Sequence, residues 1–278
     1  MLTELGHDGI GTAYTHRRVS AEAPTLLLIH GLGLTRDSWL PLIDCVEGAN
    51  IVAYDLLGHG DSPPPPNELS LDDLADQAHG LLHELGAGPV HVIGHSMGAL
   101  IALELALTHP TVISTLTCLS AVCSRHAASR AAVEARAAQI ASAPEMSGVE
   151  ETLTRWFGAE DKDDAPARRA AIRATLAANR PAEYGAVYGL FARADDAFAN
   201  RLGELACPAL FLTGADDPNS TPRMSREMAA EAPHAYAQII DDARHMLPIT
   251  HPETVATAIA ELVNAQPDTG SSADMCIA

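Results

Sequence analysis

The chain has 278 residues, of which 47% are hydrophobic and 19% are charged, a composition typical of a globular protein rather than a disordered or fibrous one. Its 36 acidic residues outnumber 17 basic ones, and the formal net charge of -19 excludes the dense positive surface that nucleic acids require. The sequence has neither an apolar run of about 18 residues that could span a membrane nor a basic, apolar leader at its start. We therefore expect a cytoplasmic protein that binds neither nucleic acid nor membrane, and the sequence leaves homo-oligomer formation open.

Six short apolar runs have the length and composition of strands that are buried on both faces. Helical patterns separate the earlier runs. Ser70 is suited to begin a helix over 71–85, and residues 97–107 are apolar at helical spacing. Pro252 is expected to begin a last helix that extends to about Val263. This alternation predicts an α/β fold with a mostly parallel, twisted sheet flanked by helices. The expected strands are 26–29, 51–54, 90–93, 115–119, 209–213 and 236–240.

The alternation of strands and helices stops between residues 124 and 201, a stretch that is rich in Ala and Arg and has a helical pattern. This stretch also holds most of the aromatic side chains of the chain, which suits the roof of a pocket. We expect an inserted helical cap at 124–201 between two parts of one α/β core, 1–123 and 202–265, with a flexible tail at 266–278. The alternative is a set of additional surface helices. The aromatic residues are Trp156, Phe157, Tyr184, Tyr188, Phe191 and Phe198.

The segment Gly94-His95-Ser96-Met97-Gly98 has the pattern GxSxG and lies directly between an expected strand and an expected helix. A serine in a sharp strand-to-helix turn has a strained backbone and needs small neighbours, which the two glycines supply. The N-terminus of the following helix favours a negative charge that develops nearby. This order of elements predicts that Ser96 is a nucleophile, and the alternative is a tight turn whose serine caps the helix.

A serine nucleophile needs a base that accepts its proton. Among 13 histidines, His245 follows the last expected strand and is therefore predicted at the carboxyl edge of the sheet, where active sites gather. Its main rival, His251, adjoins Pro252 and is better explained as the start of a helix. The sequence favours His245 as the base.

The base in turn needs an acid that orients it, and the loop after the fifth expected strand offers Asp216 and Asp217. Asp217 lies three residues after Gly214, which begins this loop, and Pro218 stiffens the chain behind it. We therefore favour Asp217 as the acid and interpret Asp216 as a turn or helix cap.

The segment His30-Gly31-Leu32-Gly33 follows the first expected strand as a flexible loop that could turn backbone amides toward the serine. The N–H groups of Leu32 and Met97 are expected to bind the oxyanion of a tetrahedral intermediate, and losing one such donor costs roughly 10²- to 10³-fold in rate. The alternative is an ordinary glycine-rich turn between a strand and a helix.

Together these motifs resemble the α/β-hydrolase superfamily, in the branch that holds small esterases, enol-lactonases, carbon–carbon bond hydrolases and cofactor-free haloperoxidases. The resemblance covers nearly the whole chain and includes the segment 55–62 (DLLGHGDS), which in the family is a structural turn beside the site. Within 124–201, the segments 155–157 (RWF) and 180–184 (RPAEY) are similar to the 3-oxoadipate enol-lactonases.

The similarity to enol-lactonases implies a substrate that carries a carboxylate and arginines that bind it. Arg125, Arg155 and Arg180 are the candidates for this contact. The full set of expected substrate-binding residues is Gly31, His95, Arg125, Arg155, Trp156, Arg180, Tyr184 and Tyr188.

The expected reaction is hydrolysis of a small-molecule carboxylic ester or lactone through an acyl-enzyme on Ser96, with His245 as base and Asp217 as its orienting acid. This mechanism requires no metal and no other cofactor. Two alternatives stay open: hydrolysis of a carbon–carbon bond in a diketone-type substrate with the same three residues, and a catalytically inactive hydrolase fold that binds a ligand.

Overall fold

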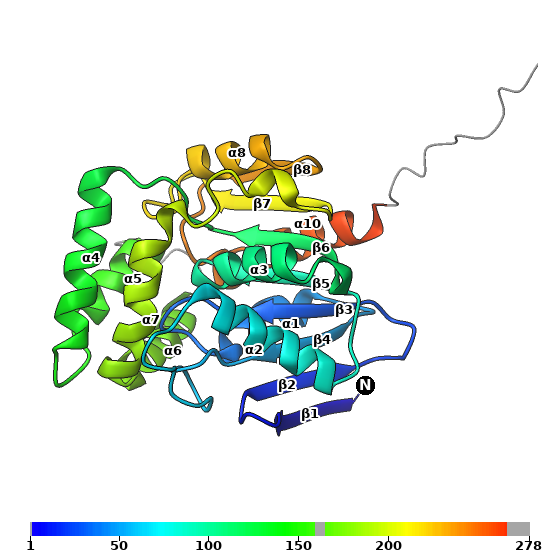
Figure 1. Cartoon of the computed structure of the whole chain (residues 1–278), viewed down its shortest axis with the longest axis horizontal. Helices are drawn as coiled ribbons and strands as arrows, with labels where there is room; N and C mark the ends of the chain where they lie inside the picture. Colours follow the sequence, from blue (N-terminus) through cyan, green and yellow to red (C-terminus); the bar gives the residue numbers. More distant parts are fainter. Residues whose placement is uncertain (1, 159–164, 266–278) are drawn as a thin grey trace, which may run out of the picture.

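The computed structural model of the chain describes residues 2–158 and 165–265. Within these ranges, eight strands form one sheet in the order β1-β2-β4-β3-β5-β6-β7-β8 (Figure 1). The strands from β3 to β8 run parallel, which confirms the α/β fold predicted from the sequence, and β1 and β2 are antiparallel to their neighbours. The bounds are β1 Leu2–His7, β2 Ala13–Arg18, β3 Thr25–Ile29, β4 Asn50–Tyr54, β5 Val90–His95, β6 Ile113–Leu119, β7 Ala209–Gly214 and β8 Ala235–Ile240.

The sequence pattern does not predict the two strands at one edge of the sheet, β1 and β2. Nearly every position of β1 is exposed, and Leu2 and Leu5 are 66% and 72% exposed. An edge strand that buries neither face has no reason to alternate apolar and polar residues. Strand β2 buries His16 beside Ala13 and Tyr14, so its buried positions are not all apolar either. Hydrophobic periodicity therefore gives no signal for this hairpin.

Helices cover both faces of the sheet. On one face lie α2, α3 and α8, and on the other lie α1, α9 and α10. The predicted helices at 71–85, at 97–107 and from Pro252 are confirmed, and Ser70 caps the first of them by accepting the N–H of Asp73. The bounds are α1 Leu40–Cys45, α2 Leu71–Glu84, α3 Met97–Thr108, α8 Pro222–Glu231, α9 Leu247–Thr250 and α10 Pro252–Asn264.

In the described residues between β6 and β7, four α-helices lie beyond the carboxyl ends of the parallel strands, at the left of Figure 1. We call α4 Ala127–Ala141, α5 Val149–Phe157, α6 Ala165–Ala178 and α7 Pro181–Arg193 the cap helices. Short 3-10 helices lie at Arg36–Trp39, Pro110–Val112, Ala194–Asp196 and Leu202–Glu204. Across the described ranges, none of the helices combines the length and the apolar character needed to cross a membrane. The tail expected at 266–278 lies outside the described residues.

Helix α3 begins in direct contact with the backbone of the sheet. A Cβ atom on Gly98 would overlap the carbonyl oxygen of Ile29 in β3, and a Cβ atom on Gly94 would overlap the carbonyl oxygen of Gly98. Because only glycine lacks a Cβ atom, these two residues allow α3 to leave the end of β5 in a sharp turn. The turn fixes where Ser96, between them, leaves the sheet.

We predict that Gly98→Ala destabilises the protein by about 1–3 kcal/mol or more, because the new methyl group meets backbone atoms that cannot move away. The matched control is Gly80→Ala in the middle of α2, where a Cβ atom meets nothing within 4 Å. That change should stabilise the protein by about 0.5–1 kcal/mol, since alanine favours helix more than glycine does. Urea unfolding of both variants measures the difference, and equal stabilities would show that the α3 contact is not tight.

Candidate active site

Ser96 is the residue at which β5 turns into α3. Its backbone has φ 55° and ψ -112°, a conformation that costs a non-glycine residue about 1–3 kcal/mol and is concentrated at functional sites. The Ser96 N–H donates to the carbonyl of Leu119 at 2.8 Å, and its carbonyl accepts the N–H of Ala99 at 3.0 Å. These bonds hold the strained turn between β6 and the first turn of α3.

Asp217 and His245 form a buried pair on two neighbouring loops, after β7 and β8. The Nδ1 of His245 lies 2.7 Å from Oδ2 of Asp217, and their side chains are 3% and 0% exposed. The other carboxylate oxygen accepts the N–H groups of Asn219 at 2.8 Å and Ser220 at 3.0 Å. Asp216, the rejected alternative, is exposed. The structure therefore pairs His245 with Asp217, and Nε2 is the ring nitrogen left to face a substrate.

Two opposing effects act on the Asp217 carboxyl. Burial alone would raise its pKa, but the adjacent His245 and the two N–H donors of Asn219 and Ser220 lower the pKa below its ordinary value. Asp217 is therefore an anion at neutral pH, and it can hold a proton on Nδ1 of His245 and stabilise the imidazolium.

The loop that carries His245 is fixed by hydrogen bonds of its backbone. The His245 N–H donates to the carbonyl of Trp156 in α5 at 3.2 Å, and its carbonyl accepts Nε2–H of His95 at 2.9 Å. Burial lowers the pKa of His95 to about 3, so this residue is a neutral donor. The ring of Trp156 lies 5.7 Å from that of His245, between centroids. A cap helix and the residue before Ser96 thus both position His245.

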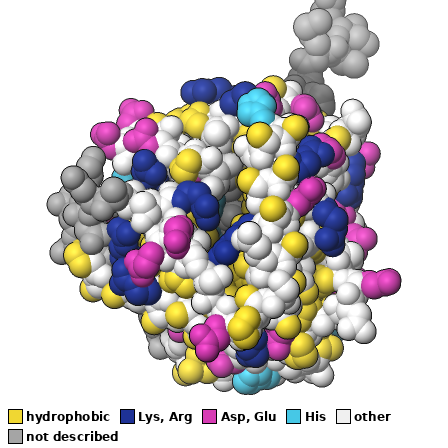
Figure 2. Space-filling view, turned by 90° about the vertical axis from the view of Figure 1, so that its left-hand side faces the viewer, with side chains coloured by type: hydrophobic (Ala, Val, Ile, Leu, Met, Phe, Trp, Pro, Cys, Tyr) yellow, Lys and Arg dark blue, Asp and Glu magenta, His cyan; other side chains and the backbone are white. Residues whose placement is uncertain are grey.

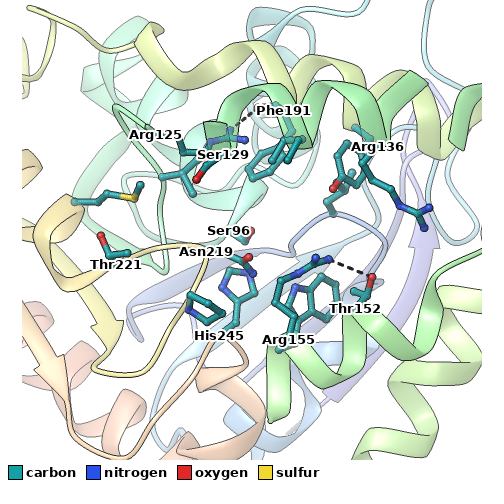
Figure 3. A pocket seen from close by; sticks show the side chains of 18 of the residues that line it. Ser96, Arg125, Ser129, Arg136, Thr152, Arg155, Phe191, Asn219, Thr221 and His245 are labelled. Carbon is teal, nitrogen blue, oxygen red and sulfur yellow. Dashed lines mark hydrogen bonds between the residues drawn. The ribbon is translucent and has the colours of Figure 1, made fainter. Parts of the chain in front are cut away.

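Ser96 and His245 face the same cavity (Figure 3). Within residues 2–158 and 165–265, no hydrogen bond joins the Ser96 hydroxyl to His245. Such bonds are often long in enzymes without substrate and tighten when substrate binds. Asp217 contacts one ring nitrogen of His245, and the other side of the ring faces the cavity that Ser96 also lines. This is the arrangement expected of a Ser-His-Asp triad.

The loop after β3 passes close to Ser96 at Gly31. A Cβ atom on Gly31 would lie 3.3 Å from Cβ of Ser96 and 3.0 Å from Nδ1 of His95. The carbonyl of Gly31 accepts Nδ1–H of His30 at 2.8 Å and the N–H of Leu34 at 3.1 Å. Because a trans peptide points its N–H away from its carbonyl, the N–H of the next residue, Leu32, faces the opposite way.

The second expected oxyanion donor is the N–H of Met97, the first residue of α3. A first-turn N–H has no partner inside its own helix and carries the positive end of the helix dipole. It is therefore suited to bind an anion beside Ser96.

The cavity has a volume of about 540 Å³ and lies between the carboxyl ends of the strands and the cap helices. Figure 2 shows this side of the molecule, where basic side chains border a hollow near the middle. Among the described lining residues, four are arginines and none is acidic. The lining comprises Leu32, Ser96, Val122, Arg125, His126, Ser129, Ala132, Val133, Ala135, Arg136, Gln139, Thr152, Arg155, Trp156, Tyr184, Tyr188, Phe191, Pro218, Asn219, Thr221, Arg223, Met224 and His245.

Two of the four arginines are engaged with the protein. Arg223 forms an ion pair with Glu227 and donates to the carbonyl of Ser124 at 3.2 Å. Arg125 is 7% exposed, donates to the carbonyl of Phe191 at 2.8 Å and lies over its ring at 4.5 Å. Both side chains are held in the wall of the cavity.

The other two arginines, Arg136 and Arg155, have neutral partners. Arg155 donates to the hydroxyl of Thr152 at 3.4 Å, a long bond that Figure 3 shows at the cavity wall. Arg136 donates to the backbone carbonyl of Ser147. In the described part of the chain, neither guanidinium forms an ion pair with a carboxylate. Their positive charges are available to an anionic ligand.

The structure brings most of the expected substrate-binding residues to this cavity but not all of them. Gly31 and His95 lie behind Ser96 rather than in the lining. Arg180, which precedes α7, pairs with Glu183 at 2.5 Å and borders a different cavity, between the end of α6 and the loops after β3 and β4. The sequence reasoning missed Arg136, which α4 presents to the cavity.

A helical stripe could have revealed Arg136. Ser129, Val133, Arg136 and Gln139 recur every three or four residues along α4, and all four line the cavity. Such spacing is typical of one helix face.

Among the described residues, no group of three or more His, Cys, Asp or Glu side chains could hold a metal ion.

We predict that stability falls as pH drops from 7 to 5, because three buried histidines are neutral in the folded state. Burial lowers the pKa of His30 to about 4 and of His59 and His95 to about 3, so the unfolded chain binds protons first. Each should contribute on the order of 1–2 kcal/mol over this range. Urea unfolding at both pH values should show a smaller decrease for His30→Asn than for the exposed control His234→Asn. Equal decreases would contradict the prediction.

Comparison with known proteins agrees with this architecture. Residues 26–258 match the model of the alpha/beta hydrolase family. The "(E)-2-((N-methylformamido)methylene)succinate hydrolase" of Acinetobacter baylyi is 34% identical over 253 residues, which cover 91% of this chain and 95% of that protein.

Two solved structures share the fold. A hydrolase from Pseudomonas aeruginosa has a TM-score of 0.84 at 23% identity, covering 95% of this chain and 98% of its own. The enol-lactonase from Burkholderia xenovorans has a TM-score of 0.81 at 22% identity, covering 91% and 96%. With the family model matching most of its length, the chain belongs to the alpha/beta hydrolase family.

Proposed function

We propose that this hydrolase cleaves a carboxylic ester or lactone of a small, anionic molecule through an acyl-enzyme on Ser96. The observation that carries the proposal is the buried pair of His245 and Asp217, which opens into the same cavity as a serine in a strained strand-to-helix turn. A nucleophile, a base and an orienting acid are what acyl transfer to water requires.

The reaction follows from the atoms that face the cavity. Nε2 of His245 takes the hydroxyl proton of Ser96 as Oγ bonds to the carbonyl carbon of the substrate. The imidazolium, stabilised by Asp217, then gives this proton to the leaving alkoxide as the carbon–oxygen bond breaks. Water, deprotonated by the same nitrogen, attacks the acyl-enzyme, and Ser96 recovers its proton as the acid leaves. The N–H groups of Leu32 and Met97 bind the oxyanion in both steps.

The charge of the cavity supports an anionic substrate. Arg136 and Arg155 have only neutral hydrogen-bond partners among the described residues, and no acidic side chain lines the described wall. A guanidinium binds a carboxylate through charge-assisted hydrogen bonds worth about 1.5–3 kcal/mol each. The substrate named for the Acinetobacter relative is a succinate, which carries two carboxylates. We therefore assign the substrate carboxylate to Arg155, with Arg136 beside it.

A second candidate is the hydrolysis of a carbon–nitrogen bond in an N-acyl compound. The name of the same relative's substrate contains a formamido group, whose carbonyl is attached to nitrogen. The Ser96 mechanism is unchanged except that Nε2 of His245 gives its proton to nitrogen as the carbon–nitrogen bond breaks. Mass spectrometry of protein quenched during turnover identifies the acyl group on Ser96, and parallel product analysis of ester and formamide substrates separates the two reactions.

We predict that a fluorophosphonate probe labels Ser96 and that Ser96→Ala abolishes the labelling. Asp217→Asn should slow labelling by at least about 100-fold, because His245 loses the anion that fixes its tautomer. The matched control is Asp216→Asn, whose exposed carboxyl does not contact His245, and it should label within about twofold of the wild-type rate. Equal loss in both aspartate variants, or labelling that survives in Ser96→Ala, would contradict the triad.

We further predict that Arg155→Gln lowers kcat/KM for p-nitrophenyl hydrogen succinate by about 10- to 100-fold, since a charged hydrogen bond is lost. Hydrolysis of p-nitrophenyl methyl succinate, which has no free carboxylate, should change by less than about threefold. Arg180→Gln is the control, because Arg180 borders another cavity and should affect neither ester. An equal effect of Arg155→Gln on both esters would show that Arg155 does not bind the free carboxylate of the substrate.

A further inference from the structure

Two buried histidines of the core hold the peptide groups that flank Leu32. Nδ1–H of His30 donates to the carbonyl of Gly31 at 2.8 Å. The N–H of Gly33 donates to Nε2 of His59 at 2.9 Å, and Nδ1–H of His59 donates to a backbone carbonyl. Burial lowers the pKa of both histidines, so both keep these roles at neutral pH. The carbonyl of Gly33, in the same loop, accepts a hydrogen bond from a residue outside the core.

That partner is Asn179, the residue that follows α6. Its Nδ2 atom lies 3.0 Å from the carbonyl oxygen of Gly33. The same nitrogen lies 3.0 Å from the carbonyl of Thr175 and 3.3 Å from that of Leu176, in the last turn of α6. Three carbonyl oxygens surround this atom, which identifies it as the amide nitrogen, since only a donor suits all three. Asn179 therefore ties the end of a cap helix to the loop.

Side chains of the cap also pack directly against Gly33. This residue has φ +76°, and a Cβ atom on it would lie 2.8 Å from Cδ2 of Leu176 and 2.9 Å from Cε2 of Tyr184. The ring of Tyr184 in turn contacts the ring of His59 edge to face at 6.1 Å. Gly33 is thus enclosed by two cap helices on one side and by the core histidine on the other.

We infer that Asn179 is a positioning residue that couples the position of cap helix α6 to the geometry of the oxyanion hole. This inference rests on the proposed function, because it concerns the Leu32 amide as an oxyanion donor. The N–H of Leu32 lies two peptide groups before the carbonyl that Asn179 holds, so a displacement of α6 reaches this donor through Gly33, against the hydrogen bonds of His59 and His30, while Ser96, His245 and Asp217 keep their own contacts. The cap then controls the rate of reaction through backbone geometry, apart from its contacts with substrate.

The consequence is a specific kinetic defect. Losing an oxyanion donor altogether costs roughly 10²- to 10³-fold in rate, and a misplaced donor costs part of this. Asn179→Ala should therefore lower kcat/KM for p-nitrophenyl acetate by about 5- to 100-fold. Phenylboronic acid adds to Oγ of Ser96 and places a negative oxygen group where the oxyanion forms, so its inhibition constant should rise by a similar factor.

Two further variants test whether the effect depends on the hydrogen bond that Asn179 donates. Asn179→Asp has the same shape but turns a donor toward carbonyls into an acceptor, and it should lose at least as much activity as Asn179→Ala. Ser142→Ala is the control, because the Ser142 hydroxyl also caps carbonyls at the end of a cap helix, α4, without reaching the core. It should leave kcat/KM and the inhibition constant within about twofold of wild type.

The readouts separate positioning from general loosening. A positioning role moves kcat/KM and boronate inhibition in parallel and leaves the pH dependence of kcat/KM and the melting temperature close to those of wild type. Folded Asn179 variants with wild-type values of both constants would overturn the inference, as would an equal loss in Ser142→Ala. Failure of the proposed function has a different signature: wild type and Ser96→Ala would be equally inactive and equally insensitive to the boronic acid.

Discussion

The close approach of helix α3 to the backbone of the sheet is the constraint on which the site depends. Neither Gly94 nor Gly98 can carry a side chain, because the carbonyl oxygens of neighbouring residues occupy the space. This contact forces Ser96 into a strained conformation, whose cost of about 1–3 kcal/mol is met by the burial of the rest of α3. Gly31 lies directly behind Ser96, so the proposed nucleophile and the proposed oxyanion loop depend on the same packing arrangement.

The electrostatics of the site depend on which groups burial leaves charged. His30, His59 and His95 are buried with lowered pKa values and serve as neutral donors and acceptors for backbone groups. Asp217 keeps its charge, because His245 and two N–H groups surround it. The chain as a whole carries a net charge of -19, whereas the described wall of the cavity holds arginines and no acids. An anion inside the cavity therefore faces positive side chains, and the low dielectric there strengthens the attraction.

Sequence patterns predicted the parallel strands, the main helices and the loops that bear Ser96, Asp217 and His245, because buried strands, caps and glycines have local signatures. They did not predict β1, whose exposed residues have no pattern to read. The similarity to enol-lactonases makes Arg180 one of three candidates for the substrate carboxylate, but its place depends on how α7 packs, which spacing alone does not determine. Contacts between distant segments, such as Asn179 with the loop after β3, arise from tertiary packing and leave no local signal.

The wide separation of the site residues along the chain has a consequence for the newly made protein. Ser96 and the loop after β3 come from the first half of the given sequence, whereas Asp217 and His245 come from its last quarter and follow β7 and β8. The ribosome therefore synthesises the turn that holds Ser96 long before it adds His245 to the chain. In the proposed mechanism, a nascent chain is inert toward esters until the loops after β7 and β8 have been made, even where its first strands have already folded.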